Sequence, residues 1–445
     1  MANIHKEDLH HNPVLRSFQL FFAKTTASGI VLIIATAIAM IWANSPWSDI
    51  YKYFWKSDTV VSVGELILFK HPFYYVINDA LMVMFFFLVG LEIKRELLVG
   101  ELSSPRKALL PVIAAIGGVV GPVIIYSIIN AGTPGASGWA IPMATDIAFS
   151  LGILSLAGNR VPLAIKVFLA ALAIVDDLMA VLVIALFFTS EIHYMALAWG
   201  GVFAVAMFVC NRLKVNNAWV YFFFGMGLWY AFLESGVHAT IAGVIAAFTI
   251  PSKSLLDKDL FFKRTEQMWN KFKENFDKNL SHELNEAEQD SLEVISKSID
   301  KMQSPLHRLE HGLNPYVAFI IMPIFALANA GVYLGEFTMD MLMNSVTVGI
   351  TLGLFFGKII GITGFVWLFS KLKITSLPDG INYSMIFAVS VLCAIGFTMA
   401  LFIANLSFPT APIMEEEAKI GILLASFIAS VLGIFALNKV LDKKA

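Results

Sequence analysis

Two adjacent carboxylates, Asp176 and Asp177, lie inside an apolar run from about Leu163 to Phe188. At about 1.5 Å per residue, a helix over this run is long enough to cross a bilayer, and the acids fall near its middle. Each acid costs about 2.5 to 3.5 kcal/mol there on insertion scales, whereas a helix with only a structural role would carry leucine. Ionisable groups at this depth are functional by default, so a buried pair that serves packing alone is the weaker interpretation.

A carboxyl group in surroundings of low dielectric constant binds a proton near neutral pH more readily than it does in water. The same group can hold a hard cation, because such cations prefer oxygen ligands. A site that holds either ion and is open to one side of the membrane at a time would exchange cations for protons. If more protons than cations move, each net charge is worth about 2.3 kcal/mol per 100 mV of membrane potential.

Two further apolar stretches contain residues that favour an interrupted helix. Asp146 follows Pro142 and Thr145 in WAIPMATDIAFSLG, and the stretch CAIGFTMALFIANLSF contains Gly396 and Thr398. Unwound backbone at membrane depth is tolerated only where it lines a cavity or is buried in protein. One break falls in the fourth predicted span and the other in the eleventh, and paired interruptions in corresponding halves indicate a transporter binding site.

Lys358, in LFFGKIIGI, is the only cation deep in the late apolar spans. Its apolar flanks on both sides argue against simple snorkelling to the interface. An amine at this depth needs an acidic partner, and Asp176 and Asp177 are the obvious candidates. Neighbouring residues on a helix point about 100° apart, so one acid can pair with Lys358 while the other faces a cavity.

Composition sets the class of protein. The chain has 445 residues, of which 58% are hydrophobic and 14% are charged, whereas soluble domains carry about 25% charged residues. We therefore expect a polytopic membrane protein in a lipid bilayer. The net charge of −2 gives no indication of a nucleic-acid partner. Cys210 and Cys393 both lie in apolar spans, so a disulfide framework is not expected.

The hydropathy pattern predicts twelve apolar spans. Their centres lie near Thr36, Phe85, Val119, Phe149, Val175, Ala204, Gly227, Val244, Pro323, Gly357, Ala394 and Ala429. Connections with Lys and Arg alternate with neutral or acidic ones, which predicts that both termini are cytoplasmic. No cleavable signal peptide is evident, and the first span is typical of a signal anchor.

Three regions follow from this pattern. Residues 1–250 should hold spans one to eight, with a small β-hairpin on the outer side near residues 59–69. Residues 251–311 should form an extended cytoplasmic loop, partly as one or two amphipathic helices. Residues 312–445 should hold spans nine to twelve.

Several long motifs together resemble the NhaA family of sodium–proton antiporters. They are FFFLVGLEIKREL, GWAIPMATDIAFSLG, ALAIVDDL, SGVHATIAGV, FALANAGV and CAIGFTMALFIA, and the likeness covers most of Phe73 to Pro251 and of Leu309 to Lys439. The resemblance implies twelve helices in two inverted repeats, with helices four and eleven unwound where they cross at mid-membrane. It also implies electrogenic, pH-regulated exchange of cytoplasmic Na⁺ or Li⁺ for external H⁺ in the bacterial inner membrane, without a cofactor or enzymatic activity.

The same resemblance implies roles for the buried polar residues. Asp177 would be the main sodium ligand, with Asp176 pairing with Lys358 and assisting. Asp146 would compensate the N-terminal dipoles of the two broken helices, and Lys358 the C-terminal ends. Thr145 would contribute an oxygen, and the crossing itself would involve Gly396 and Thr398.

A cluster at the cytoplasmic mouth would sense pH. From the residues alone, Glu92, Arg95 and Glu96 could equally be solvated charges at a helix end, and the resemblance adds Glu310 and His311 to a pH sensor. Two departures affect this region. The segment Leu255–Ser304 is longer than the usual loop of the family, and Asn314 stands where a histidine is expected. The outer hairpin would make a homodimer contact.

Two other functions are compatible with single features of the chain. An intramembrane aspartyl protease needs two acids on separate helices, for which Asp146 and Asp177 could serve. The adjacent Asp176 and the buried Lys358 fit that chemistry poorly. A cation channel usually has a repeated filter or a ring of charges, and the sequence has neither.

Overall fold

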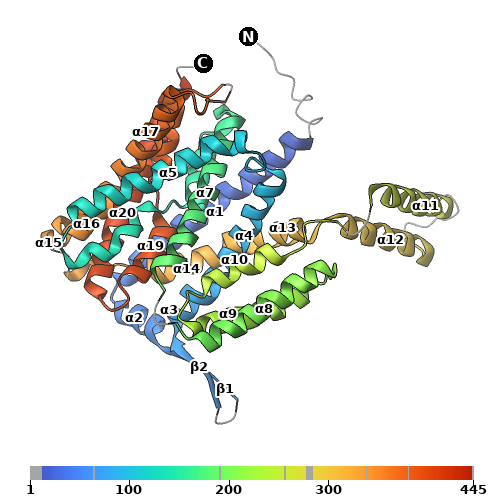
Figure 1. The fold of residues 1–445 in the computed structure, drawn as a ribbon, viewed down its shortest axis with the longest axis horizontal. Helices are drawn as coiled ribbons and strands as arrows, with labels where there is room; N and C mark the ends of the chain where they lie inside the picture. Colours follow the sequence, from blue (N-terminus) through green and yellow to red (C-terminus); the bar gives the residue numbers. More distant parts are fainter. Residues whose placement is uncertain are drawn as a thin grey trace.

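The computed structural model describes residues 13–63, 66–189, 192–254, 257–276, 284–336, 338–378 and 380–442, to which the following applies. Helices make up nearly all of this part, which confirms the predicted helical membrane protein (Figure 1). Within it, one two-stranded antiparallel sheet is formed by β1 (Asp58–Val63) and β2 (Leu66–Pro72). Gly64 and Glu65, where the sequence predicts the turn, lie outside the described residues.

The helical elements of the first half are α1 (Pro13–Ala43), α2 (Ser48–Lys56), α3 (Phe73–Val76), η2 (Ile77–Leu81), α4 (Met82–Val99), α5 (Pro105–Ile129), η3 (Pro134–Met143), α6 (Ile147–Leu156), η4 (Gly158–Arg160), α7 (Leu163–Phe187), α8 (Tyr194–Arg212), α9 (Ala218–Ser235) and α10 (Thr240–Thr249). Here η marks a 3₁₀- or π-helical element. Because α3, η2 and α4 follow each other directly, they form one span of 27 residues.

The helical elements of the second half are α11 (Lys258–Phe276), α12 (Glu286–Met302), α13 (Pro305–Tyr316), η5 (Val317–Ile321), α14 (Met322–Asn329), η6 (Leu334–Glu336), α15 (Met339–Met343), α16 (Ser345–Leu352), η7 (Gly353–Gly357), α17 (Lys358–Lys371), α18 (Tyr383–Cys393), α19 (Phe397–Ser407) and α20 (Pro412–Asp442). Among the described residues, three π-helical turns, η2, η5 and η7, lie inside otherwise α-helical spans.

Among the described residues, seven helical stretches are long and apolar enough to cross a membrane, and ten if each bent helix pair counts as one. The two predicted spans beyond these ten correspond to α9 and α10. The ten residues of α10 extend only about 15 Å, half the thickness of a bilayer core. Twelve crossings therefore stay a prediction.

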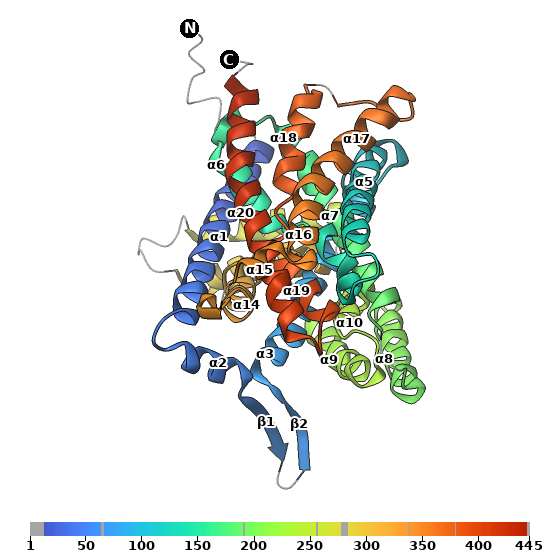
Figure 2. The same cartoon turned by 90° about the vertical axis from the view of Figure 1, so that its left-hand side faces the viewer.

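The bundle has two distinct ends (Figure 2). The beginning of α1 and the end of α20 lie at the same end, whereas α2 and the strands β1 and β2 lie at the opposite end. Below, these are called the termini end and the strand end.

Glycines let α5 and α17 approach until their backbones touch. A Cβ atom on Gly117 would lie 2.2 Å from the carbonyl oxygen of Gly361, and one on Gly121 would lie 2.3 Å from that of Gly357. Small residues at helix contacts permit such packing in membranes. The contact fixes the start of α17, and therefore Lys358, against α5.

The segment between α10 and α13 contains two helices that pack on each other and lie beside the bundle (Figure 1). The sequence predicted one or two helices here, and both α11 and α12 are present. Asn285 caps α12 in a reciprocal bond with Glu288. Trp269, on α11, is 55% exposed.

Candidate functional site

Two broken helices meet at the centre of the site. The axes of η3 and α6 differ by 45°, and those of α18 and α19 by 49°, which confirms the predicted interruptions. The backbone N–H of Asp146 donates to the carbonyl of Ile395 over 2.8 Å, and the Thr145 hydroxyl donates to that of Cys393 over 3.0 Å. The two breaks therefore satisfy each other's free backbone groups, as unwound segments in a membrane must. The half-helix before Asp146 is 3₁₀-helical, which the sequence did not indicate.

Asp146 caps both half-helices that begin at the breaks. Its Oδ1 accepts the Phe149 N–H of α6 over 2.9 Å. Its Oδ2 accepts the Thr398 N–H of α19 over 3.2 Å and the Thr398 hydroxyl. Free N–H groups and a partial positive charge concentrate at helix N-termini. A carboxylate between two such ends is therefore favourable, and this geometry fits the dipole compensation expected of Asp146. Gly396 lies at the start of α19, where a Cβ would lie 3.1 Å from the Ala144 carbonyl.

Lys358 contacts Asp176, as the resemblance implied. The distance from Nζ to Oδ2 is 2.6 Å, and both side chains are buried. Lys358 begins α17 directly after the π-helical turn η7, a distortion that is frequent at functional sites. Removing one partner of a buried ion pair leaves an uncompensated charge, so each of these residues depends on the other.

Asp177 has no such partner, although it adjoins Asp176 on α7. The side chain is 1% exposed, and its Oδ2 has no hydrogen-bond partner among the described residues. It lines a cavity of about 370 Å³ together with Asp146, Glu92 and Glu310. The helical rotation of about 100° between neighbours thus turns one acid to the lysine and the other to the cavity.

The predicted mouth residues gather along this cavity. Arg95 lies 3.0 Å from a carboxylate oxygen of Glu96 and 2.8 Å from one of Glu310, while Glu92 and His311 line the cavity wall. Glu96 and Glu310 are 8% and 5% exposed. The interpretation as a solvated charge at a helix end is therefore wrong for Glu96. Asn314, the departure from the family pattern, also lines the cavity.

Residue-by-residue reading of the sequence missed two groups. The hydroxyl of Ser150 donates to the Leu392 carbonyl over 2.9 Å and adds a further bond between the broken helices. Asn78, Asn329 and Asn405 form a hydrogen-bonded cluster nearer to the strand end. The available signal was asparagine inside otherwise apolar runs, which is costly unless the amide is bonded.

A sequence model of the family described as Na⁺/H⁺ antiporter 1 matches residues 19–437. The chain belongs to the NhaA family of Na⁺/H⁺ antiporters. It is 47% identical to the Na⁺/H⁺ antiporter NhaA of Koribacter versatilis, over 94% of this chain and 90% of that protein. The NhaA proteins of Oleidesulfovibrio alaskensis and Shewanella oneidensis are 46% and 44% identical, over 94% and 96% of this chain and 92% and 99% of their own lengths.

This membership decides between the functional classes. NhaA is a family of transporters, so the chain is not an enzyme, and the aspartyl-protease interpretation is excluded.

Proposed function

We propose that this NhaA-family chain exchanges cytoplasmic Na⁺ or Li⁺ for external H⁺ across the bacterial plasma membrane. The observation that carries the proposal is the unequal surroundings of two adjacent acids. Each acid has one oxygen without a hydrogen-bond partner in the described part of the chain, but Asp176 lies 2.6 Å from Lys358, whereas Asp177 lines the cavity. A carboxylate without an ion-pair partner in the protein can bind a proton or a cation that exchanges.

The ion would bind at Asp177, with Asp176 as a second carboxylate. Thr145 adds an oxygen, since its hydroxyl donates to Cys393 and keeps two lone pairs for accepting. Asp146 and the first turn of α19 hold the crossing in shape around the site. A proton and a cation then compete for one carboxylate, and binding of one requires release of the other.

Exchange follows if this site opens to one side at a time. With two or more protons moving against one Na⁺, each cycle would carry net charge and respond to the membrane potential. The positive charge of Lys358 offsets the negative charge of Asp176. This limits the net negative charge of the site when a cation is bound.

The mouth cluster would regulate this exchange by pH. Arg95 pairs with Glu96 and with Glu310, and Glu310 lines the same cavity as Asp177. Protonation of these acids, of Glu92 or of His311 would change the charges that face Arg95. We therefore assign pH regulation to these five residues, separately from the competition at Asp177.

The remaining expectations complete the proposal. We propose twelve crossings, with α9 and α10 added to the ten candidate spans, arranged as two inverted repeats with both termini in the cytoplasm. Residues 1–250 and 312–445 form the two transmembrane regions, and residues 251–311 form a cytoplasmic insert. The sheet of β1 and β2 lies outside and makes the homodimer contact.

Cation-induced proton flux in proteoliposomes tests the function directly. A proton-sensitive dye inside the vesicles should report proton movement when Na⁺ or Li⁺ is added, and much less when K⁺ is added. The Asp177→Asn variant, reconstituted in the same orientation, should give no signal. A cation-induced flux that persists in Asp177→Asn would contradict the assignment of the site.

A further inference from the structure

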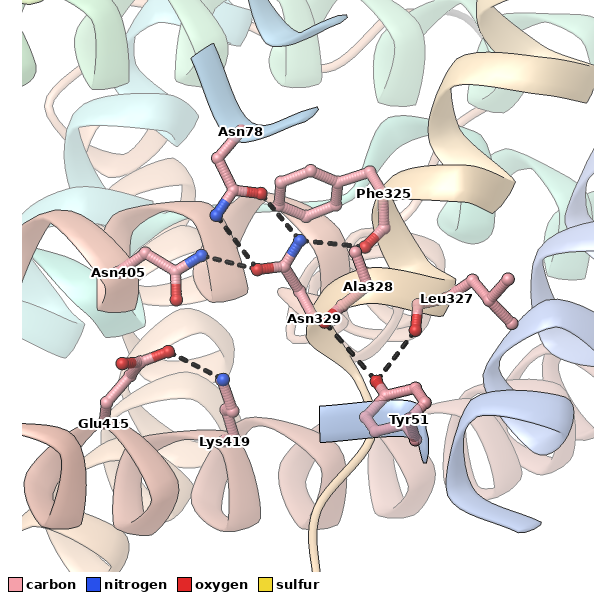
Figure 3. Close-up of polar contacts among 9 residues, drawn as sticks. All are labelled: Tyr51, Asn78, Phe325, Leu327, Ala328, Asn329, Asn405, Glu415 and Lys419. Atoms are coloured by element: carbon pink, nitrogen blue, oxygen red, sulfur yellow. Dashed lines mark hydrogen bonds and ion pairs between the residues drawn. The ribbon is translucent and has the colours of Figure 1, made fainter. Parts of the chain in front are cut away.

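Three side-chain amides form one hydrogen-bonded cluster nearer to the strand end (Figure 3). Asn329, the last residue of α14, donates to Asn78 Oδ1 over 2.7 Å and accepts from Asn78 Nδ2 over 3.2 Å. Its Oδ1 also accepts from Asn405 Nδ2 over 2.7 Å. Asn78 and Asn329 are buried, so these bonds are not exposed to bulk water.

Two of the amides belong to one group of helices. Tyr51 of α2 donates to the carbonyl of Leu327, 2.8 Å away, near the end of α14 (Figure 3). Asn44, directly after α1, donates to the Val332 carbonyl over 2.8 Å and accepts the Leu334 N–H. The end of α14 is therefore tied to α1 and α2. Asn78, in η2, packs against the same helix.

Asn405 belongs to the group that carries the ion site. It lies on α19, the half-helix whose first turn is capped by Asp146, and α19 packs on η3 and α20. Thr398 and Asn405 are seven positions apart, or about 10 Å along the helix. The bond from Asn405 to Asn329 therefore joins α19 to the α1–α2–α14 group nearer to the strand end, in addition to the packing of α1 on α6.

The cluster and the cavity lie toward opposite ends of the same span. Glu310 and Asn329 belong to the stretch Pro305–Asn329, and a helix of that spacing separates them by about 28 Å. Between cluster and site, Phe402 packs against Phe86 and Phe325, with ring centroids 5.6 and 6.4 Å apart. None of the three asparagines is among the described residues that line the cavity, whereas the mouth residues Glu310 and His311 are.

We propose that Asn405 and Asn329 form a latch that holds the two helix groups together on the outer side while the ion site is open to the cytoplasm. The latch rests on the proposed alternating exchange, because its release is the step that would open the outer side. Asn405 is a positioning residue here, since it touches neither ion but sets which side the site faces.

The chemistry of the contact suits a reversible latch. Hydrogen bonds between neutral side chains of membrane helices change an equilibrium by only about 3- to 20-fold. A buried ion pair at the same place would be far harder to separate. The latch uses the Nδ2 atom of Asn405, so breaking it removes one neutral hydrogen bond and leaves no charge behind. The Oδ1 atom of Asn405 is buried and has no hydrogen-bond partner within the described ranges.

Cysteine labelling from the outer side tests the latch without measuring transport. Ala326 is fully buried on α14, one turn before Asn329. A cysteine there, in a chain that lacks Cys210, should react with a membrane-impermeant maleimide only when the outer side opens. The blank is the same chain without the new cysteine, which keeps only the buried Cys393. Asn405→Leu should raise the labelling rate by about 3- to 20-fold, and Asn405→Gln, which keeps the amide, should stay close to the original rate.

Asn44→Leu is the matched control, because it removes two amide bonds within one helix group. It should lower the thermal unfolding temperature without raising the labelling rate. Equal labelling of Asn405→Leu and the original chain would overturn the latch, as would an equal increase in Asn44→Leu. If Asn405→Leu does not fold, Asn405→Ala takes its place. If the original chain shows no cation–proton exchange but Asn405→Leu still labels faster than the original chain, the proposed function is contradicted and the latch stands.

Discussion

The two adjacent acids of α7 have different surroundings. Asp176 forms an ion pair with Lys358, whose position is fixed by the glycine contacts between the start of α17 and α5. On another side of α7, Asp177 lines a cavity. One turn of a single helix therefore holds a buried ion pair and a second acid that lines a cavity. In the proposed exchange, two acids stay in the membrane and chiefly one of them binds the transported ion.

The largest expected effect is at the cavity side. Asp177→Asn should lower cation-induced proton flux by at least about 100-fold, since even residues that only orient metal ligands contribute about 10- to 100-fold. The variant should fold normally, because Asp177 holds no ion pair in the described structure. Asp340→Asn, at an exposed position of α15, is the control and should transport normally. Full exchange by Asp177→Asn would remove the distinction between the two sides.

The lysine side should respond mainly in stability. Asp176→Asn leaves Lys358 buried without its acid, and breaking a buried pair costs about 3 to 5 kcal/mol. Thermal unfolding in detergent should therefore occur at a clearly lower temperature than for Asp177→Asn. The double variant Asp176→Asn/Lys358→Met removes the stranded charge and should recover much of the loss. Equal unfolding temperatures for the two single variants would show that the pair does not support the fold.

Competition sharpens the comparison kinetically. If Asp177 holds a proton or a cation but never both, the KM for Na⁺ should rise about tenfold per pH unit for each competing proton below the pKa of the site. Saturating Na⁺ should then restore the rate at acidic pH. The measurement is Na⁺-dependent transport at several pH values, with equal pH on both sides. A constant KM with a falling maximal rate would instead favour control by the mouth residues Glu92, Glu96 and His311.

The smallest effect is expected for the insert. The Leu306 N–H donates to the Pro251 carbonyl over 3.1 Å, so the two ends of the insert are adjacent. A short Gly/Ser linker can therefore replace residues 255–304. The residues described around the cavity all lie outside this segment. Transport should continue with an unchanged KM at alkaline pH, and only its pH profile should shift. Complete loss of transport in a correctly inserted variant would show that α11 and α12 belong to the exchange machinery.

Sequence reasoning reached the charged part of the site because charge in a membrane is conspicuous. Asp146, Lys358 and the acid pair each stand out against apolar neighbours, and Pro142 and Gly396 mark the breaks. The residues alone left open which acid pairs with Lys358. The rotation of about 100° shows that the two side chains point in different directions, but not which of them points to the lysine. Family resemblance supplied that choice.

Neutral and long-range features were harder to predict. The amides of Asn78, Asn329 and Asn405 come from three distant stretches, and only the fold shows that they complete each other's hydrogen bonds. Two predicted spans, α9 and α10, are missing from the ten candidates, and α10 is missing because it has only ten residues. Burial of Glu96 and Glu310 depends on Arg95 reaching both, which no local pattern specifies.

The ion pair of Asp176 and Lys358 also sets an order of events during synthesis. The two residues are 182 positions apart, which corresponds to about 10 to 40 s of translation at about 5 to 20 residues per second. During that interval α7 has to remain in the bilayer with its acids unpaired, held only by the apolar residues on either side of them. A ribosome that stalls before Lys358 would leave a membrane segment with no counter-charge, and such a nascent chain would be a ready substrate for membrane proteases.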